Sequence, residues 1–132
     1  MKLDELNEYT RAKKDVAIIR QSLEDHRSRI AAVGGQDFSG VCGSRYPEDK
    51  QAEILDITVR LEQALKAAER RLRAAGRKFT KAIRACEGVE VSILVMRFEE
   101  GMSNREISRK IHYSERTISR IFYSISQKIA IC

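Results

Sequence analysis

Residues 102–129 constrain the fold most, because they read as two short helices joined by a tight turn. Ser103 is a good N-cap residue, and Glu106 follows three positions later as a capping box requires. His112–Tyr113 interrupts the pattern, and Ser114 supplies a second N-cap. Apolar residues recur at helical spacing on both sides of the interruption: Ile107 and Ile111 before it, then Ile118, Ile121, Phe122, Ile125 and Ile129. Two short helices separated by a turn of about three to four residues define a helix-turn-helix.

The outward face of the second helix indicates a function. With its isoleucines turned to a core, Glu115, Arg116, Ser119 and Arg120 face away from it. Arg can hold guanine through two hydrogen bonds, Glu can accept one from cytosine, and Ser can serve several bases. We therefore expect residues 114–128 to enter the DNA major groove, with these four side chains reading bases. The alternative is that the arginines only solubilise an exposed helix face.

Positive charge is concentrated in the C-terminal half of the chain. Residues 66–84 contain eight basic side chains and one acidic one, and the formal net charge of the whole chain is +6. Beside a helix-turn-helix, this asymmetry indicates phosphate contacts, although a charge run can also be a solvated face. The side chains expected to meet DNA phosphates are Arg77, Lys78, Lys81, Arg105, Arg109, Lys110, Ser114, Thr117, Tyr123 and Lys128.

The C-terminal third resembles the helix-turn-helix of sigma-70 region 4. The matching stretches are 93–98 (ILVMRF), Gly101, Glu106–Ile107, Ile111, Ser114 and 117–121 (TISRI). Ser108 stands where that family usually has Ala, and His112 where Gly or Asn often takes the left-handed turn. The layout of the chain also resembles phage late-transcription regulators of the ArpU/RinA-like group. The resemblance implies a DNA-binding regulator in a bacterial host cell, with RNA polymerase as a possible partner.

The N-terminal part predicts helices that need a packing partner. Residues 3–30 read as one helix with a coiled-coil-like seam formed by Tyr9, Ala12, Val16, Ile19, Leu23, His26 and Ile30. This helix either packs on a neighbour in the same chain or forms an intermolecular coiled coil. Residues 31–49 contain four of the seven glycines and the only proline, so we expect a loop that ends at a helix start near Pro47.

A second, longer helix is expected from about residue 48 to Cys86. Its apolar positions are Ile54, Ile57, Leu61, Leu65, Ala68, Leu72, Ala75, Phe79 and Ile83. A helix of this length needs either the N-terminal arm folded back on it or a second subunit. Residues 1–86 would then form a packing and oligomerisation segment, with a homo-oligomer, a dimer first, as the expected assembly.

Residues 87–132 would form the helix-turn-helix domain, with residues 87–101 as its first helix. Gly88 and Gly101 would bracket that helix. Its expected core is Val89, Ile93, Val95, Met96, Phe98, Ile107, Ile111, Ile118 and Ile121. The sequence thus predicts an all-α fold: a long helical hairpin or coiled-coil-like segment followed by a C-terminal trihelical helix-turn-helix unit.

Other classes of protein fit the sequence less well. Three widely separated cysteines argue against a disulfide framework or a zinc site and favour a reducing cytoplasm. No apolar run is long enough for a membrane span, the glycine-rich stretch lacks nucleotide-binding motifs, and no paired catalytic groups occur. We expect no enzyme, metal or cofactor, but a sequence-specific DNA-binding transcriptional regulator. The alternatives are a small-terminase-like DNA-packaging subunit and a sigma-like factor acting through RNA polymerase.

Overall fold

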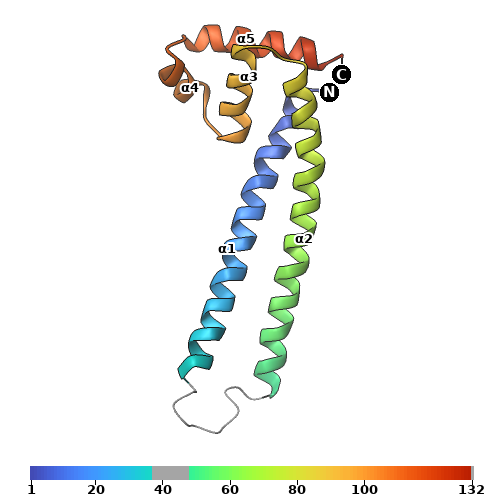
Figure 1. The fold of residues 1–132 in the computed structure, drawn as a ribbon, viewed down its shortest axis with the longest axis vertical. Coiled ribbons are helices and arrows are strands. Elements are labelled where there is room, and N and C mark those ends of the chain that lie inside the picture. Colours follow the sequence, from blue (N-terminus) through green and yellow to red (C-terminus); the bar gives the residue numbers. More distant parts are fainter. Residues whose placement is uncertain (37–47, 132) are drawn as a thin grey trace. The chain divides into compact units, whose positions relative to one another are not determined.

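The computed structural model describes residues 1–36 and 48–131, and every regular element in these ranges is helical. The elements are η1 (Leu3–Leu6), α1 (Asn7–Gln36), α2 (Glu48–Arg84), α3 (Val89–Leu94), the π-helical turn η3 (Val95–Glu99), α4 (Asn104–Ile111) and α5 (Glu115–Ile129) (Figure 1). The predicted all-α class is confirmed. The chain forms two compact units, here called the hairpin unit (Lys14–Arg70) and the terminal unit (Met1–Lys13 with Arg71–Cys132).

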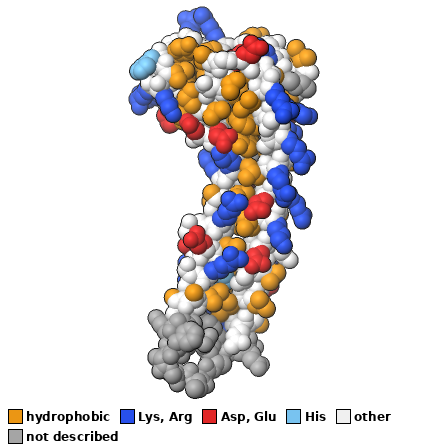
Figure 2. Space-filling model, viewed as in Figure 1, with side chains coloured by type: hydrophobic (Ala, Val, Ile, Leu, Met, Phe, Trp, Pro, Cys, Tyr) orange, Lys and Arg blue, Asp and Glu red, His pale blue; other side chains and the backbone are white. Residues whose placement is uncertain are grey.

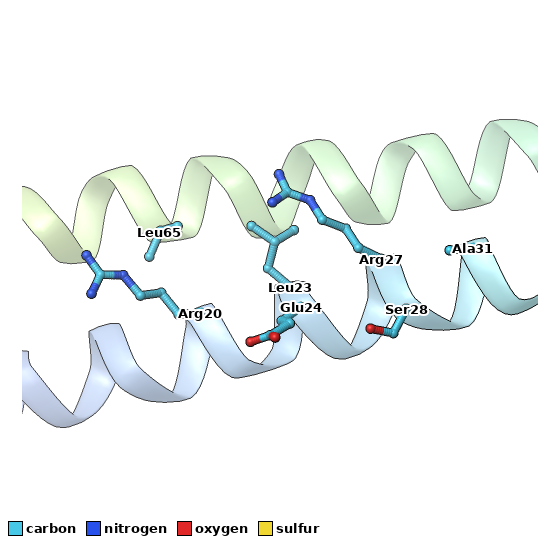
Figure 3. Close-up of a pocket in the computed structure, with 7 residues that line it drawn as sticks. All are labelled: Arg20, Leu23, Glu24, Arg27, Ser28, Ala31 and Leu65. Carbon is cyan, nitrogen blue, oxygen red and sulfur yellow. The ribbon is translucent and has the colours of Figure 1, made fainter.

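In the hairpin unit, α1 packs against α2 of the same chain. The seam residues of α1 are buried or half-buried, and Leu23 lies between the two helices near Leu65 (Figure 3). His26 contributes a polar contact to this seam, with its Nε2 2.9 Å from Thr58 Oγ1. Two ion pairs cross between the helices, Arg20 to Glu69 at 3.4 Å and Arg27 to Glu62 at 3.2 Å. Of the two partners that the sequence left open for α1, the structure uses the one within the chain.

The buried face of α2 follows a regular heptad repeat, which the predicted apolar positions matched only in part. Its inward positions alternate by four and three residues: Ile54, Thr58, Leu61, Leu65 and Ala68, then Leu72, Ala75, Phe79 and Ala82. The same spacing leads to the buried Cys86, just beyond the end of the helix. Ile57 was expected on this seam, but 47% of its surface is exposed. Thr58 takes the inward position because a heptad needs a step of four after Ile54. Ile83, also expected there, is half-buried beside the fully buried Ala82.

The ends of the two long helices differ from the predicted loop at residues 31–49. The helix α1 continues through Gln36, so the predicted loop start at Ala31 is wrong. Gly34 and Gly35 do not stop it, since a glycine costs a helix only about 1 kcal/mol relative to alanine. The helix α2 begins at Glu48, within the predicted start at residues 47–49. The rest of the predicted loop, residues 37–47, lies outside the described residues.

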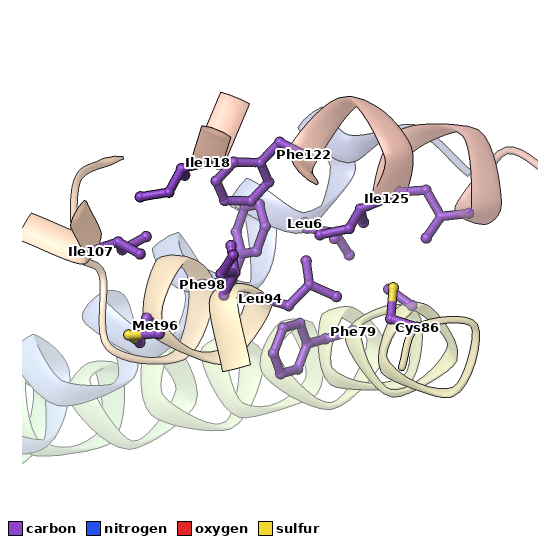
Figure 4. Close-up of a cluster of buried hydrophobic side chains, with 13 residues drawn as sticks. Leu6, Phe79, Cys86, Leu94, Met96, Phe98, Ile107, Ile118, Phe122 and Ile125 are labelled. Atoms are coloured by element: carbon purple, nitrogen blue, oxygen red, sulfur yellow. The ribbon is translucent and has the colours of Figure 1, made fainter. Parts of the chain in front are cut away.

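The core of the terminal unit draws on both ends of the chain. Its buried residues are Leu6, Phe79, Ala82, Cys86, Ile93, Leu94, Met96, Phe98, Ile107, Ile118, Phe122, Ile125 and Ile129 (Figure 4). Leu6 comes from η1, Phe79 and Ala82 come from α2, and Cys86 follows α2, so the predicted boundary at residue 86 runs through this core. Val89 was expected inside it but is 42% exposed, because it is the first residue of α3. Val95, Ile111 and Ile121 are half-buried against the core.

The segment between Gly88 and Gly101 was predicted as one α-helix, but it changes from an α-helix to a π-helical turn at Val95. In η3 the Glu100 amide donates to the Val95 carbonyl at 3.0 Å, and the Met102 amide donates to the Met96 carbonyl at 2.9 Å. Gly88 and Gly101 have φ values of +58° and +71°, which suit glycine and mark both ends of the segment. The wider turn still buries Met96 and Phe98 in the core, and Glu99 stays on the surface.

Candidate nucleic-acid interface

The turn between α4 and α5 is built by the caps that the sequence predicts. Ser103 Oγ accepts a hydrogen bond from the Glu106 amide at 3.2 Å, and Ser114 Oγ accepts one from the Thr117 amide at 3.1 Å. His112 closes α4 in the left-handed conformation, with φ +61° and ψ +29°. The two predicted helix starts and the left-handed turn are therefore confirmed, and α4 and α5 meet at a short connection (Figure 1).

Ser108 ties this turn from inside α4. Its hydroxyl donates to the Tyr113 carbonyl at 2.5 Å, across the two residues that break the helical pattern. From the sequence, Ser108 is notable only because it stands where the sigma-70 family usually has Ala. The hydroxyl gives it a further role, because it satisfies a backbone acceptor in a turn that has few helical hydrogen bonds.

The helix α5 separates an apolar face from a polar one. Ile118, Ile125 and Ile129 are fully buried and Phe122 is nearly so. All four predicted base-reading side chains lie on the exposed face: Glu115, Arg116, Ser119 and Arg120. Within the described part of the chain, neither Arg116 nor Arg120 forms an ion pair. Their guanidinium groups can thus meet a ligand without first leaving a carboxylate.

Several predicted phosphate contacts surround that face. Arg105 and Arg109 are exposed on α4, and Tyr123 on α5 is 69% exposed. Ser114 and Thr117 lie at the start of α5, with their hydroxyl oxygens 2.8 Å apart. These groups stand at a helix N-terminus, where backbone amides favour an anion.

Of the predicted phosphate contacts outside α2, two already face carboxylates. Lys110 Nζ lies 3.5 Å from Glu100 Oε2. Lys128 donates to Glu90, which also accepts from Ser124. The hydrogen bond from Lys128 lowers the pKa of Glu90, and the same bond raises the pKa of Lys128. Both lysines remain partly exposed, but their charge is balanced within the chain.

The three predicted contacts on α2 do not share one surface. Arg77 and Lys81 border a groove in the terminal unit, together with Arg73 and Arg84. Lys78 is not among the residues of this groove, and its Nζ lies 3.8 Å from Glu5 Oε2. Arg73 and Arg84 belong to the basic run of residues 66–84 but were not among the predicted contacts.

A polar clamp between α1 and η3 was missed by the sequence analysis. Tyr9 donates to Glu99 Oε2 at 2.9 Å, Lys13 donates to Glu99 Oε1 at 3.0 Å, and Thr10 donates to the Phe98 carbonyl at 2.9 Å. Burial, with Glu99 adding to it, raises the pKa of Tyr9 to about 12. The hydrogen bond from Lys13 holds the pKa of Glu99 below its ordinary value. The heptad pattern marks Tyr9 only as a seam residue, so no sequence signal identifies this clamp.

Ser119 also borders a small cavity of about 240 Å³ in the terminal unit. Asp4, Asn7, Arg97 and Asn104 contribute polar groups to its lining. The Oδ1 atom of Asn104 is buried there without a hydrogen-bond partner in the described structure. Asp4 and Asn7 from the N-terminal segment therefore line the same cavity as Ser119 of α5.

The described residues contain no cluster of His, Cys, Asp or Glu that could hold a metal ion. None of the described helices has the length and apolar character needed to cross a membrane. Comparisons with protein-family models, curated proteins and solved structures find no match for this chain.

Proposed function

We propose that this chain is a sequence-specific DNA-binding transcriptional regulator that docks α5 in the major groove. The observation that carries the proposal is the capped α4–α5 turn with Arg116 and Arg120 exposed on the outer face of α5 and without ion pairs in the described structure. In helix-turn-helix proteins, the N-terminal residues of the second helix reach the base edges. Glu115 and Ser119 lie on the same exposed face and would complete the reading surface.

The surrounding side chains would fix the position of the helix on the duplex. Arg105, Arg109 and Tyr123 are exposed, and the hydroxyls of Ser114 and Thr117 stand at the start of α5. Phosphate contacts of this kind set orientation and register but carry no sequence information directly. If two copies bind as a two-fold dimer, the operator should contain half-sites spaced by whole helical turns. The resemblance to the helix-turn-helix of sigma-70 region 4 supports a role near RNA polymerase.

The test is a selection of bound fragments from genomic DNA, repeated at two salt concentrations. We expect one enriched motif, with affinity for that motif surviving higher salt better than affinity for random DNA. The double variant Arg116→Ala/Arg120→Ala should lose the motif. The matched control Arg11→Ala/Arg29→Ala removes two exposed arginines from α1 and should keep it.

Binding without sequence preference that collapses at higher salt would contradict the regulator. Such binding would fit a packaging or architectural protein, and a ring of many copies in solution would point to packaging. Loss of the enriched motif in the control variant would also contradict the assignment of base reading to α5.

A further inference from the structure

A groove of about 860 Å³ runs along the part of α2 that belongs to the terminal unit. Tyr9, Phe79 and Ile83 give it an apolar lining. Gly76 also borders the groove, and it has no side chain to fill the space. A Cβ atom at this position would lie 3.7 Å from Tyr9 Cε1, an ordinary contact, so the backbone here does not require glycine.

Four cationic side chains line the same groove: Arg73, Arg77, Lys81 and Arg84. Their spacing of four, four and three residues places them on one face of the helix. All four are exposed, and none forms an ion pair within the described residues. Figure 2 shows Lys and Arg side chains gathered along α2. The acidic group at the groove, Glu99, is already paired with Lys13, so the charge left over is positive.

We propose that this groove binds an acidic amphipathic helix of a partner protein. The cations from Arg73 to Arg84 extend over about 16 Å at the ordinary rise of an α-helix, or roughly three turns of a bound helix. An apolar stripe on the partner would cover the partly buried Tyr9 and Ile83, while its acidic flank faces the four cations. Such a helix laid in an apolar groove is a common mode of peptide recognition.

The lining of the groove favours a peptide over DNA as its occupant. A DNA backbone supplies phosphates and sugars, which would meet the cations but leave the aromatic and aliphatic lining without an apolar partner. An acidic amphipathic helix matches both surfaces at once. The groove also lies on α2, whereas the proposed DNA-reading face lies on α5. This docking role goes beyond the proposed function and does not depend on it.

The experiment uses a synthetic peptide helix of about four turns, with Leu and Phe on one face and Asp and Glu on the other. A second peptide has the same composition with its apolar residues scattered around the helix. Binding of each to the full chain is measured by fluorescence anisotropy. We expect the amphipathic peptide to bind at least about tenfold more tightly than the scattered one, because only it presents an apolar stripe.

Two variants test the two halves of the recognition. Arg77→Glu/Lys81→Glu should weaken the amphipathic peptide by at least about tenfold. The matched control Arg71→Glu/Arg11→Glu reverses two exposed charges of the same unit outside the groove and should change binding by less than about threefold. Gly76→Leu fills the groove without changing charge and should also abolish binding. Gly76→Ala serves as its folding control, and circular dichroism verifies the helix content of each variant.

Three results would overturn the proposal. Equal binding of the two peptides would show that charge alone attracts them. Unchanged peptide binding in a folded Gly76→Leu variant would place the peptide elsewhere. If Arg77→Glu/Lys81→Glu weakened DNA binding or self-association but left the peptide unaffected, the groove would belong to DNA or to a second copy. Peptide binding is measured without DNA, so failure of the DNA selection would leave this result intact.

Discussion

Tyr9 of α1 stacks on Phe79 of α2, with ring centroids 4.6 Å apart and ring planes inclined by 11°. Phe79 in turn meets the ring of Phe98 in η3 edge to face, at a centroid distance of 6.5 Å. Aromatic pairs of this kind contribute about 0.5–1.5 kcal/mol beyond their buried area. One aromatic cluster in the terminal unit therefore joins α1 to α2 and η3, which lie far from it in the sequence.

Leu6→Ala should destabilise the terminal unit by about 2–5 kcal/mol, because it leaves a cavity at a fully buried position. Urea unfolding followed by circular dichroism measures this change. Ile18→Ala is the control, since Ile18 is 63% exposed, and it should shift stability by less than about 0.5 kcal/mol. An effect of Leu6→Ala as small as that of the control would mean that η1 does not belong to the core.

The clamp at Glu99 should make the terminal unit sensitive to acid. The folded-state pKa of Glu99 is lowered, so its contribution is complete above the ordinary value of 4.5 and is lost as the pH falls through the lower folded value. The Lys13 and Glu99 side chains are 35% and 40% exposed, which limits the pair to less than about 1 kcal/mol. Unfolding at neutral and acid pH should therefore show a smaller pH dependence for Glu99→Gln. A dependence identical to that of the unchanged protein would rule out this role.

The phenol of Tyr9 should lose its proton only at unusually high pH. Its pKa is raised from 10.0 to about 12 because burial and Glu99 both disfavour the phenolate. The folded-state value lies above the unfolded one, so the contribution of Tyr9 is complete below pH 10.0 and is lost as the pH rises toward about 12. Alkaline titration of tyrosine absorbance should contain a late step that is missing in Tyr9→Phe. If both proteins titrate alike, the hydroxyl is not held by Glu99.

His112→Gly should stabilise the helix-turn-helix by about 1 kcal/mol, since glycine adopts the left-handed conformation without the steric cost of a Cβ atom. His112→Val should have the opposite sign, because β-branched residues tolerate positive φ poorly. Thermal unfolding of the two variants gives the comparison. Destabilisation by glycine would mean that the imidazole makes a contact worth more than the strain.

Arg116→Ala and Arg120→Ala should each cost about 1–3 kcal/mol of DNA affinity and relax the preference at one base position. Arg105→Ala and Arg109→Ala should weaken all sequences alike and make the salt dependence shallower. Binding to a set of single-base operator variants at several salt concentrations separates the two classes. Identical behaviour of all four variants would contradict the division into base-reading and phosphate-contacting residues.

The sequence predicts local structure here far better than the contacts between distant segments. The caps at Ser103 and Ser114 depend on residues three positions apart, so both helix starts in the helix-turn-helix can be predicted. Heptad spacing likewise predicts the inner face of α1. Nothing local indicates that Leu6 packs in the C-terminal core or that Tyr9 bonds Glu99. The prediction that Ile57 is buried failed for a similar reason. The position of the partner helix decides which residues at the edge of an apolar face are buried, and the sequence does not give that position.

The same distinction between local structure and distant contacts applies to the candidate site. The exposure of Glu115, Arg116, Ser119 and Arg120 follows from the period of α5, and it was predicted. The ion pairs that balance Lys110 and Lys128 join different elements, so the sequence does not reveal them. Arg73 and Arg84 were visible only as members of a charge run. Both border one groove, and the apolar lining of that groove depends on tertiary packing, which the sequence does not show.

The burial of Leu6 against α5 also sets an order of events during synthesis. Leu6 leaves the ribosome long before Ile125, and at ordinary translation rates the interval is on the order of ten seconds. Throughout that time the site that will bury Leu6 does not exist, because α5 forms part of it. A nascent chain therefore carries the apolar Leu6 exposed until α5 has been made. The outer face of α5 and the core that supports it are therefore completed together, when α5 has been made.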